Sequence, residues 1–184
     1  MPKKLENYLK GKLKGINLSK VVDVILFGSV VKGKEFPADI DICIIFREKI
    51  DSELVDKISS KMEGIKVHIN TLIADNFFKK PHSLIKTMLV EGKSILTGRK
   101  IINNFGFSSV SLYSYNLSNL KSSDKVKLVY LLRGRKGEIG IVRKLGGEWI
   151  ADNCFIFPIE KDYEISNIFK KWGIEYKKKE VLIH

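Results

Sequence analysis

Two carboxylates stand two positions apart in an apolar stretch, where Asp39 and Asp41 flank Ile40 and the apolar run 42–46 follows. Residues two apart in a strand point to the same face, so both acids are expected to face the same way. Paired acids beside a buried strand repel each other and lose hydration, and are tolerated chiefly where cations neutralise them. A hard divalent ion, Mg²⁺ or Mn²⁺, shared with substrate phosphates is the cation that suits these ligands.

A second chemical feature precedes the acids. The β-branched run 21–27 ends at Gly28, which predicts a buried strand that closes in a tight turn. Gly28 lets the backbone approach a phosphate closely, and Ser29 adds a hydroxyl and an N–H at a predicted helix start. The two features together predict a site for a metal and a phosphate.

The segment LFGSVVKGKEFPADIDICIIF carries both features, with nine residues between Ser29 and Asp39. It resembles the polymerase β-like nucleotidyltransferase superfamily, in its small or minimal form, whose signature is an apolar strand, Gly-Ser, a spacer and Asp-x-Asp. Lys32-Gly33 and Glu91-Gly92 resemble further pairs in its small members. The resemblance covers roughly residues 21–98.

The resemblance implies an α/β (α+β) fold, with a nucleotidyltransferase core of mixed β-sheet and flanking helices. It also implies an enzyme that transfers a nucleoside monophosphate from an NTP to an acceptor hydroxyl, with pyrophosphate leaving. Asp39 and Asp41 would bind Mg²⁺ or Mn²⁺, Gly28 and Ser29 would hold the terminal phosphates, and Lys32 would add a positive charge there.

One departure concerns the third carboxylate of that family, which stands on the strand after the helix. This sequence has Val67-His68-Ile69-Asn70-Thr71 there. His68 is a candidate catalytic residue, either as a metal ligand or as a general base, since neutral imidazole serves as both. The alternative is a structural histidine. Asp75, beyond the strand, is a weaker substitute for the missing acid.

The hydrophobic pattern predicts two modules, a nucleotidyltransferase domain over residues 1–102 and a small basic α+β domain over residues 108–184. In the first we expect a helix ending near Gly15, then strand, strand, helix, strand and a further helix. In the second we expect strands over 110–115, 154–159 and 174–183, and helices over 124–132 and 163–172.

The second module contains a basic, Gly-rich stretch over residues 133–147. Its cations could bind nucleic-acid phosphates, RNA above all, or could be solvated loop charges; they are Arg133, Arg135, Lys136, Arg143 and Lys144. The run 177–179 of three lysines is expected to extend this basic surface. Four aromatic residues alternate on strands, which permits base stacking or core packing: Tyr113, Tyr115, Phe155 and Phe157.

The composition also limits the function. Lys and Arg number 33 against 21 Asp and Glu, and the formal net charge of +12 favours a nucleic acid or an NTP as partner. The charge could instead serve solubility or high-temperature life. Cys43 and Cys154 have neither disulfide nor zinc spacing. No segment approaches the ~20 apolar residues of a membrane span, so we expect a cytoplasmic protein without a membrane partner.

Two alternatives to a nucleic-acid acceptor remain open. A compact core without the third acid also fits an enzyme that nucleotidylates (AMPylates) a partner protein in a toxin–antitoxin type of system. The altered third position instead fits a nucleic-acid-binding module that has lost catalysis, although retention of both Asp39 and Asp41 speaks against this.

Overall fold

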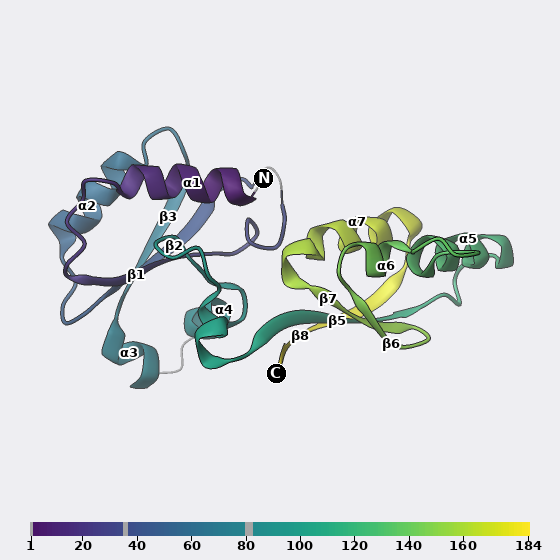
Figure 1. The fold of residues 1–184 in the computed structure, drawn as a ribbon. Coiled ribbons are helices and arrows are strands. Elements are labelled where there is room, and N and C mark those ends of the chain that lie inside the picture. Colours follow the sequence, from purple (N-terminus) through teal and green to yellow (C-terminus); the bar gives the residue numbers. More distant parts are fainter. Residues whose placement is uncertain (1, 35–36, 80–82) are drawn as a thin grey trace. The chain divides into compact units, whose positions relative to one another are not determined.

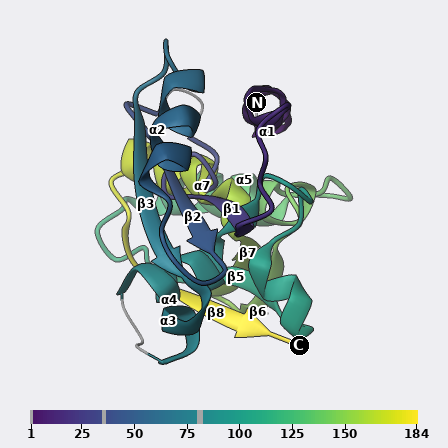
Figure 2. The same ribbon diagram turned by 90° about the vertical axis from the view of Figure 1, so that its left-hand side faces the viewer.

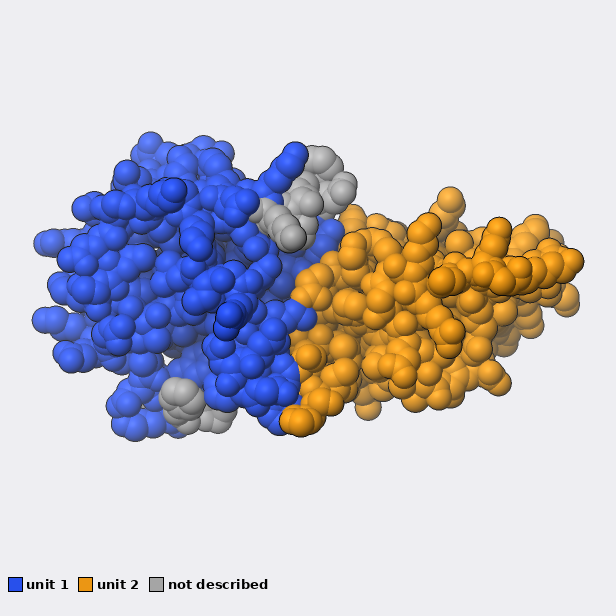
Figure 3. All heavy atoms as spheres, viewed as in Figure 1, with its two compact units in different colours: residues 1–107 blue, residues 108–184 orange. Residues whose placement is uncertain are grey.

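The structure is a computed structural model that describes residues 2–34, 37–79 and 83–184. The chain divides into two compact units, residues 1–107 and 108–184, which Figure 3 distinguishes by colour. Each unit has its own sheet and its own core. None of the helices described is long and apolar enough to cross a membrane.

The first unit is a four-stranded mixed sheet with helices on both faces (Figures 1 and 2). Its strands are β1 (Val21–Phe27), β2 (Ile40–Phe46), β3 (Val67–Ile73) and β4 (Lys93–Ser94), in the order β3-β2-β1-β4. Its helices are α1 (Pro2–Leu13), α2 (Ser52–Lys61), α3 (Ala74–Lys79) and α4 (Ser83–Glu91), followed by the 3-10 helix η1 (Ile101–Phe105). This architecture confirms the predicted mixed sheet with flanking helices.

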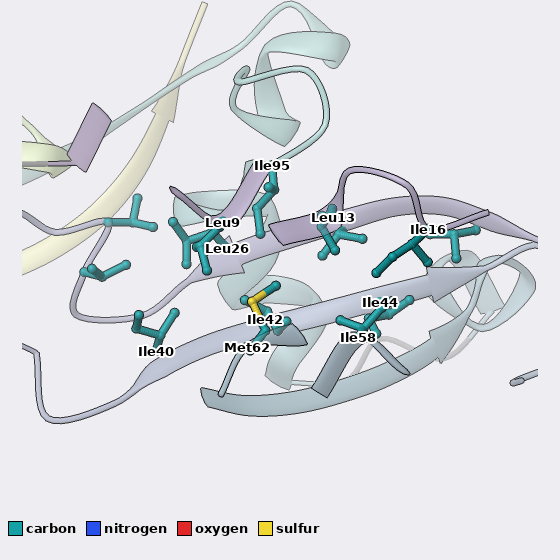
Figure 4. Packing of buried hydrophobic residues seen from close by; sticks show 14 of the residues in the cluster. Leu9, Leu13, Ile16, Leu26, Ile40, Ile42, Ile44, Ile58, Met62 and Ile95 are labelled. Atoms are coloured by element: carbon teal, nitrogen blue, oxygen red, sulfur yellow. The ribbon is translucent and has the colours of Figure 1, made fainter. Parts of the chain in front are cut away.

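Alternate residues of β1 and β2 enter two different cores because strand side chains alternate between faces. One core packs against α1 and α2 and includes Leu26, Ile42 and Ile44, with Ile58 from α2 (Figure 4). The other packs against α3, α4 and η1 and includes Ile25, Cys43 and Ile45. Because both faces of the sheet are covered, the sequences of β1 and β2 are nearly continuous apolar runs.

The helix between β2 and β3 begins where Asp51 caps it. The Asp51 side chain accepts a hydrogen bond from the N–H of Leu54 at 3.1 Å, which satisfies one of the free donors of the first turn. The helix ends at Lys61, with Met62 as its C-cap, before Gly64 turns the chain with φ of 92°. This crossover lets β3 run parallel to β2.

The second unit places three helices on one face of an antiparallel sheet (Figure 1). Its strands are β5 (Ser108–Asn116), β6 (Glu148–Ala151), β7 (Cys154–Pro158) and β8 (Glu175–Ile183), in the order β6-β7-β5-β8. Its helices are α5 (Ser122–Arg133), α6 (Ile141–Lys144) and α7 (Asp162–Trp172), with the 3-10 turn η2 (Ile159–Lys161) before α7. Strand, helix, two strands, helix and strand in this order form a ferredoxin-like topology.

Aromatic side chains fill the core of the second unit. Tyr113 and Phe155 stack with ring centroids 5.3 Å apart, and Phe157 and Phe169 meet Tyr113 edge to face. Tyr115 belongs to the same core. The four aromatic residues that could have stacked on bases are therefore core residues. They occupy alternate positions of β5 and β7, and all four point to the sheet face that the helices cover.

Candidate active site

The neighbouring strands bring the predicted site residues to one end of the first sheet. Phe27 pairs with Asp41 across the antiparallel β1–β2 ladder, so Gly28 follows at the same edge. Asp41 pairs with His68 across the parallel β2–β3 ladder. Residues directly opposite each other in a ladder point to the same face, so the imidazole and the carboxylate lie side by side.

The two acids and the histidine form a compact cluster. The Nδ1 atom of His68 lies 3.6 Å from Oδ2 of Asp39 and 3.5 Å from Oδ1 of Asp41. The carboxyl side chains are 32% and 31% exposed, so both reach solvent. Lys66 adds a positive charge, with its Nζ 3.9 Å from Oδ2 of Asp39. The cluster therefore pairs two negative groups with one cation and one titratable ring.

Gly28 makes room for one of the carboxylates. Its φ is +81°, a conformation that favours glycine. A Cβ placed on Gly28 would lie 2.6 Å from Oδ2 of Asp41, which is closer than two such atoms can approach. The backbone at the end of β1 thus packs directly against the carboxylate of β2.

The segment after Gly28 is a series of tight turns and not the helix that we expected at Ser29. Within residues 28–34, the N–H of Val31 donates to the carbonyl of Gly28 at 3.1 Å, and the N–H of Lys34 donates to the carbonyl of Ser29 at 3.2 Å. Val30 and Val31 are buried in the core under α1. Their burial and the left-handed Gly28 hold the chain in a turn, so a helix does not start here.

Lys32 is held by an acid that comes from far along the chain. Its Nζ lies 2.8 Å from Oε2 of Glu91, the last residue of α4, whose side chain is only 4% exposed. A buried carboxylate needs such a partner because desolvation of an unpaired charge is costly. The positive charge expected to face phosphates is therefore engaged with Glu91, and the ion pair ties the turn to α4.

The carboxylate pair suits a divalent ion better than the histidine does. Carboxylate oxygens are the ligands that Mg²⁺ and Mn²⁺ prefer, and Asp39 and Asp41 supply two sets on one edge. In the described part of the chain, no group of three or more His, Cys, Asp and Glu side chains is arranged to hold a metal ion. Asp75, considered as a substitute acid, is exposed and forms an ion pair with Lys79 within α3.

Cys43, the next residue on the face of Asp41, is chemically inert. Burial raises the pKa of its thiol to about 12, because the thiolate would lose its hydration in the core under α4. The thiol therefore stays protonated and acts as a small apolar side chain.

Two of the predicted basic groups of the second unit are engaged within that unit. Arg133 donates to the backbone carbonyl of Asp152 at 2.6 Å and lies over the ring of Trp149, 4.1 Å from its centroid. Lys178 donates to the buried carboxylate of Asp162 at 2.7 Å, and Tyr113 donates to the same group at 2.9 Å. These cations stabilise the fold and are not free to bind phosphates.

The other predicted cations of this unit lie at its surface. Arg135, Lys136, Arg143 and Lys144 are exposed. Residues 108–184 contain 14 Lys and Arg against 9 Asp and Glu, so they carry +5 of the net charge of +12. The positive charge is therefore shared by both units and is not concentrated in the second.

Sequence reasoning missed two residues that shape the site. Lys66 stands two positions before His68 and shares its face, so a period of two could have identified it. Glu91 offered no local signal for its pairing, because it meets Lys32 across 59 residues of sequence. The Glu91-Gly92 pair indicated the end of a helix and gave no indication of the ion pair with Lys32.

Comparison with known proteins gives one family match. The profile of the family described as "Polymerase beta, Nucleotidyltransferase" matches residues 3–100. No curated protein matches the chain.

Solved structures with detectable similarity include the complex of a tri-AMPylated HEPN toxin with the MNT antitoxin from Shewanella oneidensis. The matching chain of that complex is 20% identical to this protein, and the match covers 57% of this protein and 79% of the matching chain, with a TM-score of 0.35. A toxin–antitoxin complex with AMP-PNP shows 22% identity over 54% of this chain and 78% of that chain, with a TM-score of 0.38.

Proposed function

Because the chain belongs to the polymerase β family of nucleotidyltransferases, we propose that it transfers a nucleoside monophosphate from an NTP to an acceptor hydroxyl, with pyrophosphate leaving. The observation that carries this proposal is the convergence of Asp39, Asp41 and His68 at the edge where Gly28 ends β1. Two carboxylates on one face, open to solvent beside a tight glycine turn, are arranged for a metal–triphosphate complex.

We assign the metal to Asp39 and Asp41, whose oxygens match the preference of Mg²⁺ or Mn²⁺. A divalent ion bound there would act as a Lewis acid on the phosphate oxygens and stabilise the charge that develops in the displacement. Substrate phosphates and water would have to supply the other ligands of such an ion, since the described residues form no group of three or more metal-binding side chains. Metal and NTP are therefore expected to bind together.

The chain's own groups then orient the nucleotide. The backbone of the turn after Gly28 and the Ser29 hydroxyl contact the terminal phosphates, and Gly28 allows the close approach. Lys32 acts here mainly through Glu91, whose buried carboxylate fixes the turn. Lys66 balances the charge of Asp39.

We assign His68 as the general base of the reaction. Its Nδ1 faces both carboxylates, which favours a proton on that atom. The opposite nitrogen, Nε2, then carries the lone pair on a side chain that is 53% exposed. Nε2 is thus placed to accept the proton of an incoming hydroxyl while Nδ1 keeps its own proton. In this role His68 would replace the third carboxylate of the family, which this chain lacks.

The acceptor that we propose first is a nucleic-acid hydroxyl, with the 3′ end of a structured RNA as the preferred case. The supporting observation is the group of four exposed cations on the loop and helix of residues 135–144, namely Arg135, Lys136, Arg143 and Lys144. Such cations contact phosphate backbones without sequence preference.

A partner protein is the second candidate acceptor. The buried ring of Tyr113 and the internally paired Arg133 and Lys178 favour it, because they remove three groups that would otherwise serve single-stranded RNA. An enzyme that nucleotidylates a protein needs no base-stacking surface.

The test incubates the whole chain with labelled NTPs, Mg²⁺ and either total RNA or total protein. A matched variant, Asp39→Asn with Asp41→Asn, removes the carboxylate charge and keeps the size of both side chains. Label transferred to RNA by the native chain but not by the variant supports the first acceptor, and label on a protein band supports the second. Unchanged Mg²⁺-dependent ATP binding in the variant, measured by calorimetry, would exclude the assigned site.

A further inference from the structure

One face of the second sheet carries no helices, since α5, α6 and α7 all lie on the opposite face (Figure 1). The residues that alternate with the core residues form this open face. Its apolar members are aliphatic: Val110 and Leu112 on β5, Ile156 and Pro158 on β7, and Val181 and Ile183 on β8. An aliphatic face of this kind suits packing against another protein surface, whereas base stacking needs aromatic rings.

The ladder places four side chains of this open face in one row across all four strands. Glu148 of β6 pairs with Ile156, Ile156 with Leu112, and Leu112 with Lys179 of β8. Neighbouring strands lie about 4.8 Å apart, so Glu148 and Lys179 are roughly 14 Å from each other at the two ends. Neither end residue has an ion-pair partner within the described ranges.

This row is complementary to a copy of itself. Consider a two-fold axis that lies between two facing sheets, parallel to the strands and level with the gap between β5 and β7. Rotation about this axis places a second sheet face to face with the first and brings its β6 edge over the β8 edge of the first. Glu148 of each copy then faces Lys179 of the other, and Ile156 faces Leu112. A two-fold axis across the strands would instead oppose like charges, so the charge pattern selects one arrangement.

We propose that the second unit forms a two-fold symmetric dimer through its open sheet face, with a second copy of this chain as the occupant. The sheets stack about 10 Å apart in the aligned manner, with the aliphatic residues between them. A reciprocal pair of Glu148 and Lys179 lies at each side of the interface.

The size of the face sets the expected strength. Four strands span about 19 Å, and the length that all four share, four residues of β6 or five of β7, is about 14 to 17 Å. The contact is therefore smaller than the roughly 800 Å² per partner of a standard interface. The dimer is therefore expected to be weak and concentration-dependent.

The experiment measures the mass of the full chain by sedimentation equilibrium from about 5 to about 500 μM at low salt. Glu148→Lys and Lys179→Glu each place like charges at both symmetric positions, which we expect to weaken dimerisation about tenfold or more. The decisive sample is an equimolar mixture of the two variants, in which both pairs are again opposite in sign. This mixture dimerises about as well as the native chain.

The control variant is Lys170→Glu, an equal charge change on α7, which covers the other face of the sheet. It leaves the dimer unchanged. A native chain that stays monomeric over the whole range, a mixture that fails to restore the dimer, or a control as disruptive as Lys179→Glu overturns the proposal.

Discussion

The contact between Gly28 and Asp41 can be tested by Gly28→Ala. The added Cβ would lie 2.6 Å from Oδ2 of Asp41, so the carboxylate must move by about 0.5 to 1 Å to restore an ordinary contact. That oxygen is the far end of a flexible side chain, so its displacement costs little stability. The φ of +81° adds about 1 to 2 kcal/mol of backbone strain.

The effect on activity is expected to exceed the effect on stability. A displacement near 1 Å in a group that positions the substrate lowers the rate about 100-fold. The matched control is Gly15→Ala, where φ is +75° and a Cβ would meet nothing within 4 Å. Both variants should lose about 1 to 2 kcal/mol in denaturant unfolding, and only Gly28→Ala should lose nucleotidyl transfer and Mg²⁺-dependent ATP affinity.

A double-mutant cycle separates the clash from the strain. In an Asp41→Ala background the carboxylate is absent, so Gly28→Ala should cost only the strain and should cause no further loss of ATP affinity. If Gly28→Ala keeps transfer and ATP affinity within twofold of Gly15→Ala, Gly28 does not act by making room for Asp41. The proposed role of Gly28 in the site would then be withdrawn.

Three further variants address single groups. His68→Ala should lower kcat by about 100-fold or more with little change in ATP binding, as expected for a general base; equal losses in both would indicate a binding role. Lys32→Met should cost at most about 3 kcal/mol of stability by removing the cation beside the buried Glu91 carboxylate, and adding Glu91→Gln should restore stability. A lower ATP affinity without destabilisation would instead place Lys32 on phosphate. Burial raises the pKa of Asp23, so its contribution to stability is fullest below its unfolded pKa and is lost as pH rises through the folded value. Asp23→Asn should therefore raise Tm at pH 7 and not near pH 3, and an equal shift at both pH values would contradict this.

The acids were predictable from sequence because their geometry is local. A spacing of two residues on a strand fixes a shared face, and the apolar neighbours of Asp39 and Asp41 indicated that strand. His68 was a candidate for the same reason, since β3 had to lie near β2. The structure places its ring beside both acids, and its catalytic role stays a prediction.

The remaining features depended on contacts that no local pattern contains. The turn at Ser29 was mistaken for a helix start because the burial of Val30 and Val31 under α1 is a tertiary effect. Strand β6 was missed because it is four residues long and follows Gly146 and Gly147, which indicate a loop. Alternation of the aromatic residues showed that they share a face, but only the packing of α5 and α7 decided that this face is buried.

The strand order has a consequence for how the protein is made. Gly28, Asp39, Asp41 and His68 all lie on β1, β2 and β3 or at their ends, which are complete by residue 73. Glu91, the ion-pair partner of Lys32, is synthesised later, and so is β4 at residues 93–94, the second neighbour of β1 in the sheet. During synthesis from the N-terminus, the acids and the histidine can thus come together before the partners that secure the turn have left the ribosome. For that interval β1 has an unpaired edge, so the newly made first unit is prone to wrong strand pairing until β4 arrives.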